Sequence, residues 1–78
     1  MATKKEVLEQ VTRGEGCLGR AEDDEPVFVL RARDMLAPEI IHEWVDRAEK
    51  AGCSAAKVAE ARELANKMVH WPGRKFPD

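Results

Sequence analysis

The second half of the sequence constrains the fold most, because two amphipathic stretches meet there at a short turn, residues 51–54. In residues 38–50 the apolar side chains share one helical face and the polar ones the other: Ile40, Ile41, Trp44, Val45 and Ala48 against Glu39, His42, Glu43, Asp46 and Lys50. In residues 55–68 the apolar residues recur at intervals of three and four: Ala55, Val58, Ala61, Leu64, Ala65 and Met68. Gly52 suits the left-handed position that ends a helix, and Ser54 suits a helix N-cap. These residues predict a C-terminal helical hairpin.

The N-terminal part predicts one further short helix. Thr3 followed by Glu6 is a capping-box pattern, and the apolar residues Val7, Leu8 and Val11 then form one narrow stripe. Gly14 and Gly16 end this helix, and we expect them to start a loop that runs through residues 17–19.

Residues 27–32 allow two interpretations. As a helix, the segment would be capped by Asp24 and would hold Pro26 in its first turn. As a strand, it has a suitable length and is rich in β-forming residues. We favour the helix, because nothing else resembles a strand and a lone strand would need a partner from a second subunit.

The predicted fold is therefore mainly α, a small bundle of three to four short helices, with an α+β fold whose strand at 27–32 pairs across a dimer as the alternative. Residues 1–78 are enough for one domain, and we expect flexible ends at 1–3 and 73–78. So short a chain buries a thin core. Because its apolar helix faces exceed what one hairpin covers, we predict a symmetric homodimer in which these faces meet or residues 27–30 are shared between the subunits.

The charge balance disfavours polyanionic partners. Lysine and arginine number 13 against 15 acidic residues, a net charge of −2, whereas proteins that coat nucleic acid or anionic membranes are usually basic. The sequence has neither the apolar region of a signal peptide nor a run long enough for a membrane span. We therefore expect a cytoplasmic protein with no membrane partner, in which Cys17 and Cys53 stay reduced as small core side chains.

A second hypothesis is that the turn at residues 51–54 belongs to a DNA-binding helix-turn-helix. Ala48, Gly52 and Val58 have the spacing of that motif, and the DNA contacts would come from Ser54, Lys57 and Arg62. The first helix of the pair is too long for the motif, however, and the face beyond the turn offers mainly alanine rather than the arginine, asparagine or glutamine that read bases. Together with the negative charge, this makes DNA binding the alternative rather than the leading hypothesis.

A metal-dependent enzyme ranks third. His42-Glu43 begins like a zinc-protease motif, but Asp46 stands where the second histidine is required. The other cysteine and histidine residues lack zinc-ligand spacing. Gly14-x-Gly16-x-x-Gly19 spells a dinucleotide-binding pattern but follows a short helix rather than a strand. We therefore predict no catalytic residue, no metal site and no cofactor.

Residues 17–50 carry a resemblance. Cys17-Leu18-Gly19, the run from Asp24 to Asp34, Ala37-Pro38 and Trp44 resemble a group of small bacterial and phage proteins to which no activity is attached. The resemblance implies a recurring small module and no chemistry. The leading hypothesis is a non-enzymatic protein that binds another protein and itself, through aromatic, aliphatic and basic residues: Phe28, Leu30, Ile41, Trp44, Trp71, Arg74 and Lys75.

Overall fold

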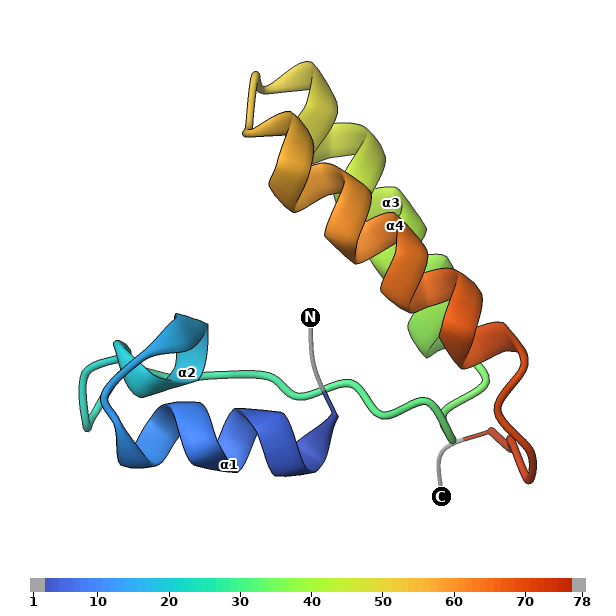
Figure 1. The fold of residues 1–78 in the computed structure, drawn as a ribbon. Helices are drawn as coiled ribbons and strands as arrows, with labels where there is room; N and C mark the ends of the chain where they lie inside the picture. The colour runs from blue at the N-terminus through green and yellow to red at the C-terminus, as the bar shows by residue number, and fades with distance from the viewer. Residues whose placement is uncertain (1–2, 77–78) are drawn as a thin grey trace.

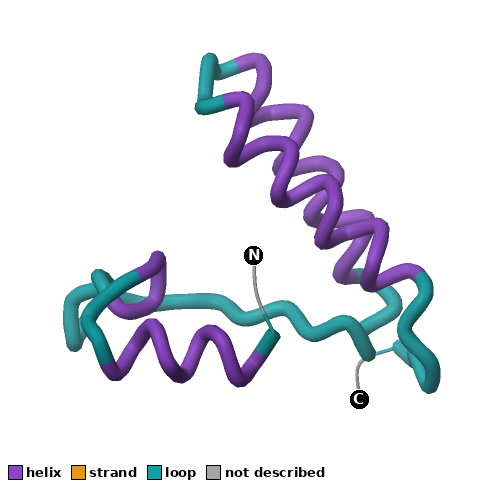
Figure 2. The backbone as a smooth tube through the Cα atoms, in the orientation of Figure 1, coloured by secondary structure: helices purple, strands orange, loops and turns teal. Residues whose placement is uncertain are grey.

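The computed structural model describes residues 3–76 and confirms the mainly helical class. Its helices are α1 (Lys4–Thr12), α2 (Gly16–Gly19), α3 (Ala37–Lys50) and α4 (Ala55–Val69). Within residues 3–76 there is no strand, only an isolated bridge between Asp34 and Lys75. The helices form two pairs, α1 with α2 and α3 with α4, joined by a long connection without regular structure (Figures 1 and 2).

The predicted C-terminal hairpin is present, and α3 and α4 run side by side along their lengths (Figure 1). Its core is a cluster of small and β-branched residues against which Ile41 packs: Val45, Ala48, Val58 and Ala61. Ala37 and Ala65 are fully buried as well, because alanine allows the two helices to approach closely. Ala55, expected in the same stripe, is exposed, because it begins α4 at the turn end of the hairpin.

The turn between α3 and α4 has the predicted geometry. Gly52 has a φ of 81°, the left-handed conformation. The amide of Gly52 donates to Glu49 O at 3.1 Å and that of Cys53 to Ala48 O at 3.0 Å, the two bonds of a Schellman motif. Ser54 Oγ then caps α4 by accepting from Lys57 N at 3.4 Å.

The open end of the hairpin is closed by the chain on either side of it. The amide of Met35 donates to Lys75 O at 2.8 Å, and that of Lys75 donates to Arg33 O at 2.8 Å. Arg74 adds a bond from its guanidinium to Met35 O at 3.0 Å. Residues 74 and 75, expected in a flexible end, are therefore held against the start of α3. Residues 1–2 and 77–78, expected to be flexible too, lie outside the described residues.

The α1–α2 pair forms a separate unit. Thr3 caps α1 as predicted, accepting from Glu6 N at 3.2 Å. The loop expected at residues 16–19 is instead the single turn of α2. Gly19 lets this turn sit against α1, because a Cβ there would lie 3.0 Å from Gln10 O. Within the described chain, no Cα atom of α1 or α2 lies within 8 Å of a Cα atom of α3 or α4.

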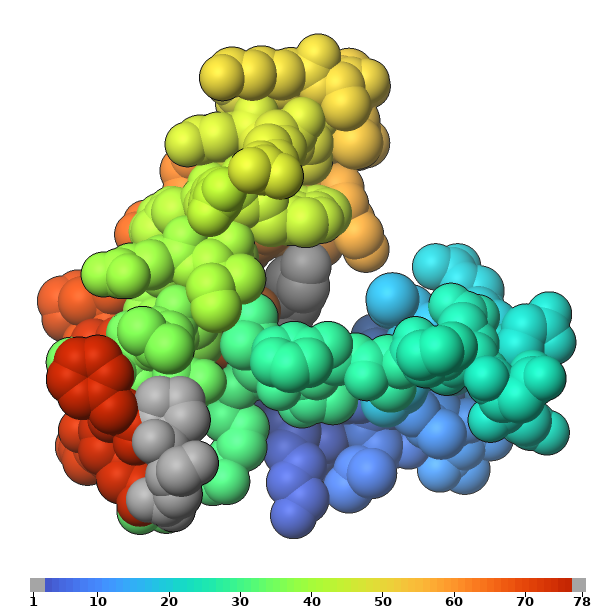
Figure 3. Space-filling view, turned by 180° about the vertical axis from the view of Figure 1, so that it is seen from behind, coloured from blue at the N-terminus to red at the C-terminus, as the bar shows by residue number. Residues whose placement is uncertain are grey.

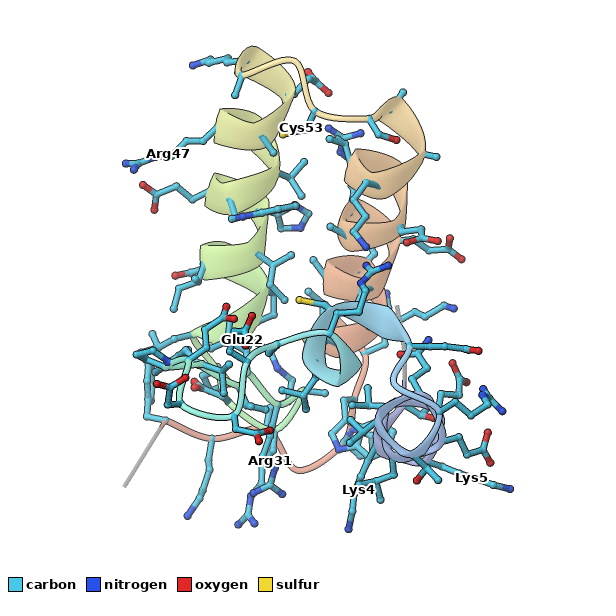
Figure 4. The ribbon with its side chains drawn as sticks, turned by 90° about the vertical axis from the view of Figure 1, so that its left-hand side faces the viewer. Lys4, Lys5, Glu22, Arg31, Arg47 and Cys53 are labelled. Atoms are coloured by element: carbon cyan, nitrogen blue, oxygen red, sulfur yellow. The ribbon has the colours of Figure 1, made fainter. Side chains whose placement is uncertain are left out.

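Two further expectations were wrong. Residues 25–31 form no helix, and we call them the linking segment. Val27, Phe28 and Val29 are weak helix formers, and no neighbouring element packs on them to offset the cost of nucleating a helix. The cysteines are not core residues either. Cys17 and Cys53 are both free and exposed, and Cys53 lies in the turn of the hairpin (Figure 4).

Candidate functional site

The linking segment carries the most exposed large apolar side chain of the described residues. Phe28 is 84% exposed, and its neighbours Val27 and Val29 are 56% and 70% exposed. Leu30, the other interaction residue predicted in this segment, is half-buried. The space-filling view shows the segment uncovered between the two helical pairs (Figure 3). Scattered exposed apolar residues are ordinary, but consecutive ones on one stretch of chain indicate a contact surface.

The backbone of this segment is also available for binding. Within residues 3–76, no backbone hydrogen bond involves positions 26–30. The segment is held only at its ends, where Glu25 N donates to Glu22 O at 3.1 Å and Asp34 N donates to Arg31 O at 3.0 Å. An extended stretch with free donors and acceptors can add a strand to another chain.

Opposite charges flank the apolar residues of the linking segment. Residues 22–25 are all acidic, and Arg31 and Arg33 follow the apolar run. The Glu25 carboxylate accepts from Glu22 N at 3.0 Å through Oε1. The Arg31 side chain points away from α3 and α4 and makes no ion pair with any residue in 3–76 (Figure 4).

A second apolar surface lies along α3. Ile40 and Trp44, four residues apart and so on one helical face, are 46% and 48% exposed. Ile41, another predicted interaction residue, is half-buried against the hairpin core. The one neighbouring helix, α4, therefore covers only part of the apolar face of α3, and Ile40 and Trp44 remain about half exposed.

Three residues of the C-terminal tail were predicted to contact a partner, and they differ in how far the fold itself uses them. Arg74 is half-buried and bound to Met35, and Lys75 takes part in the backbone bridge, so both have a role within the fold. Trp71 remains 57% exposed. The structure thus joins the tail to the residues just before α3. From the sequence, only Phe28 and Leu30 of the linking segment were predicted as site residues, although residues 27–30 were expected as one possible shared segment of a dimer. The exposed Val27 and Val29 belong to the same surface.

All three residues predicted to contact DNA belong to the helical hairpin, and two of them have partners within it. Ser54 is the N-cap of α4, and Arg62 forms an exposed ion pair with Glu49 at 3.2 Å. Lys57 is exposed on the first turn of α4. In a helix-turn-helix the two helices cross at a wide angle, whereas α3 and α4 lie side by side (Figure 2).

Residues 3–76 show neither of two other kinds of functional feature, a metal-binding cluster and a membrane-spanning helix. Among the described residues, no set of three or more histidine, cysteine, aspartate or glutamate residues is arranged to hold a metal ion. None of the helices in residues 3–76 combines the length and apolarity that a membrane crossing requires. The glycines at positions 14, 16 and 19 shape the connection between α1 and α2 and do not follow a strand.

Comparisons with known proteins found no similarity: no protein family model, no curated protein and no solved structure matches this sequence.

Proposed function

We propose that this protein is a non-enzymatic protein-binding module that associates with itself, and that the linking segment is its contact. The observation that carries the proposal is the exposure of Phe28, at 84%, between two valines that are more than half exposed. Burying one large apolar side chain contributes about 1.5–3 kcal/mol to an association. The unpaired backbone of positions 26–30 supports a contact of the strand-addition kind.

Sedimentation equilibrium at micromolar concentration tests the proposal. We expect twice the mass of one chain for the unaltered protein and the mass of one chain for Phe28→Ser. Phe76→Ser is the matched control, because Phe76 is 67% exposed but lies outside the linking segment. This variant should remain dimeric. Both substitutions should leave the helical bands of the far-ultraviolet circular dichroism spectrum unchanged, since neither side chain is part of the core of the helical hairpin. A wild-type monomer whose melting temperature is independent of protein concentration would contradict the proposal.

Two arguments rank DNA binding below protein binding. The side-by-side packing of α3 and α4 supports a hairpin, and Arg62 is engaged by Glu49 at 3.2 Å. If Lys57 has no DNA-binding role, Lys57→Ala should leave folding unchanged, and the protein should show no salt-dependent retention on duplex DNA. Retention that falls steeply with rising salt, and falls again in Lys57→Ala, would favour the helix-turn-helix alternative.

A cytoplasmic location is part of the same proposal. Cys17 and Cys53 are both free and exposed, and exposed thiols persist in a reducing compartment. Cell fractionation of a tagged chain should recover it with cytoplasmic markers, and recovery with secreted or membrane fractions would contradict the location.

A further inference from the structure

We infer that two copies of the linking segment pair as antiparallel strands in one register, with Phe28 opposite Phe28 of the partner subunit. This inference rests on the proposed function and specifies its partner. Three properties of residues 25–31 support it: their charge pattern, the position of proline and the unused backbone groups.

The charge pattern selects an antiparallel arrangement. The segment begins with Glu25 and ends with Arg31, and Phe28 is its midpoint. Antiparallel pairing about Phe28 places Glu25 of each copy opposite Arg31 of the other, so that both ends carry opposite charges. Parallel pairing would place like charges together, which destabilises a sheet.

Glu25 and Arg31 can each still form an ion pair with another subunit. The Glu25 carboxylate uses Oε1 to accept from Glu22 N at 3.0 Å. Its Oε2 has no bond within the described range, and Arg31 has no ion pair there. Each subunit therefore offers one carboxylate oxygen and one guanidinium to the other.

Pro26 fixes the hydrogen-bonding pattern of the register. Opposed residues in antiparallel strands alternate between hydrogen-bonded and non-hydrogen-bonded pairs, and proline has no N–H to donate. If the Phe28 pair is non-hydrogen-bonded, the pair of Pro26 with Leu30 is also non-hydrogen-bonded, and the missing N–H costs nothing. The donors then come from odd-numbered residues, all of which have an N–H.

The unused backbone groups are the ones this register requires. Val27 and Val29 exchange N–H···O bonds with Val29 and Val27 of the partner subunit, and their groups make no bond within residues 3–76. At the ends, Arg31 N can donate to Glu25 O of the other copy. The Glu25 N–H and the Arg31 carbonyl are already engaged in local turns, at 3.1 and 3.0 Å, so the ladder ends there. The two Phe28 side chains meet at the centre, where opposed Cα atoms approach to ~4.5 Å.

Charge exchange between subunits tests this register. Glu25→Arg alone brings two arginine pairs together in a homodimer, and Arg31→Glu alone brings two glutamate pairs together. Each variant by itself should dimerise at least tenfold more weakly than the unaltered protein. Mixed in equal amounts, the two should form a heterodimer of restored affinity, because both end pairs are then attractive. Native mass spectrometry separates the heterodimer from the two homodimers.

Control variants come from an exposed pair on α3. Glu43 and Arg47 form an ion pair at 2.8 Å outside the linking segment, and Glu43→Arg or Arg47→Glu changes the net charge by the same amounts. Both controls should dimerise normally. Dimers that tolerate both Glu25→Arg and Arg31→Glu, or single variants whose mixture is no tighter than either alone, would overturn the register. If Phe28→Ser still dissociates those dimers, the proposed function stands, whereas a monomeric wild-type protein overturns both.

Discussion

Shortening Val45 to alanine tests the description of the hairpin core. Val45 is 1% exposed, the largest side chain of the described residues that is this completely buried. Two carbon-sized groups are lost at about 0.8 kcal/mol each, and the cavity that remains adds to this, giving about 2–3 kcal/mol. Alanine favours a helix by up to ~0.6 kcal/mol over valine, so the net loss should be about 1.5–2.5 kcal/mol.

The matched control is Val69→Ala at the end of α4. Val69 is 46% exposed, so only about half of the transfer free energy is lost there. The gain in helix propensity offsets most of this, and the unfolding free energy should change by less than ~0.5 kcal/mol. Because both variants replace valine with alanine in a helix, the difference between them measures the free energy of burial apart from helix propensity.

Thermal and urea unfolding followed by far-ultraviolet circular dichroism measures the difference. For a domain of this size, Val45→Ala should lower the melting temperature by about 6–20 °C, and Val69→Ala by only a few degrees. All three proteins must be compared at one concentration, because self-association makes the melting temperature depend on it. Equal shifts in the two variants would refute the packing of α3 on α4 described above.

Three further predictions concern local features. Gly52→Ala forces a side chain into a left-handed turn with a φ of 81° and should cost about 1–2 kcal/mol of unfolding free energy in urea titration; an unchanged midpoint would contradict the turn. Arg74→Met removes the bond to Met35 O at 3.0 Å, should cost about 1–3 kcal/mol and should speed amide exchange at Met35; unaltered exchange would show that the tail is not held there. Cys17 and Cys53 are exposed, so both should react with a thiol reagent without denaturant; a thiol that reacts only after unfolding would contradict its placement.

Local signals in the sequence were enough to predict the helix ends of the hairpin and of α1. Thr3, Gly52 and Ser54 act within a few residues of themselves, and each makes the predicted bond or adopts the predicted backbone conformation. The helical periodicity likewise predicted that Ile41, Val45 and Ala48 face the core, whereas Ile40 and Trp44, expected on the same face, are about half exposed. Such signals succeed because capping and periodicity need no knowledge of distant residues.

The errors concern contacts between distant parts of the chain. Asp24 and Pro26 had the form of a helix start, but Val27, Phe28 and Val29 are more than half exposed, so tertiary support for a helix is missing there. The bridge from Met35 to Lys75 depends on where α4 ends in space, which no local pattern encodes. A four-residue helix such as α2 is too short to produce a periodic signal. Of the candidate site, Phe28 was predicted from its residue type, whereas the exposure of both valines beside it follows only from the absence of a packing partner.

Disulfide trapping tests most directly whether two copies meet at the linking segment. In a chain carrying Cys17→Ser and Cys53→Ser, Val27→Cys and Val29→Cys are made in separate chains, so that Phe28 stays in place, and Phe76→Cys is the control. In the proposed register, Val27 opposes Val29 of the partner subunit as a hydrogen-bonded pair, whose Cα atoms are ~5.5 Å apart, within the distance that a disulfide spans. Under mild oxidation, an equal mixture of Val27→Cys and Val29→Cys should run as a covalent dimer on non-reducing gels, while Phe76→Cys should run at the mass of one chain. A mixture that forms no covalent dimer, or cross-linking of Phe76→Cys to the same extent, would contradict the account.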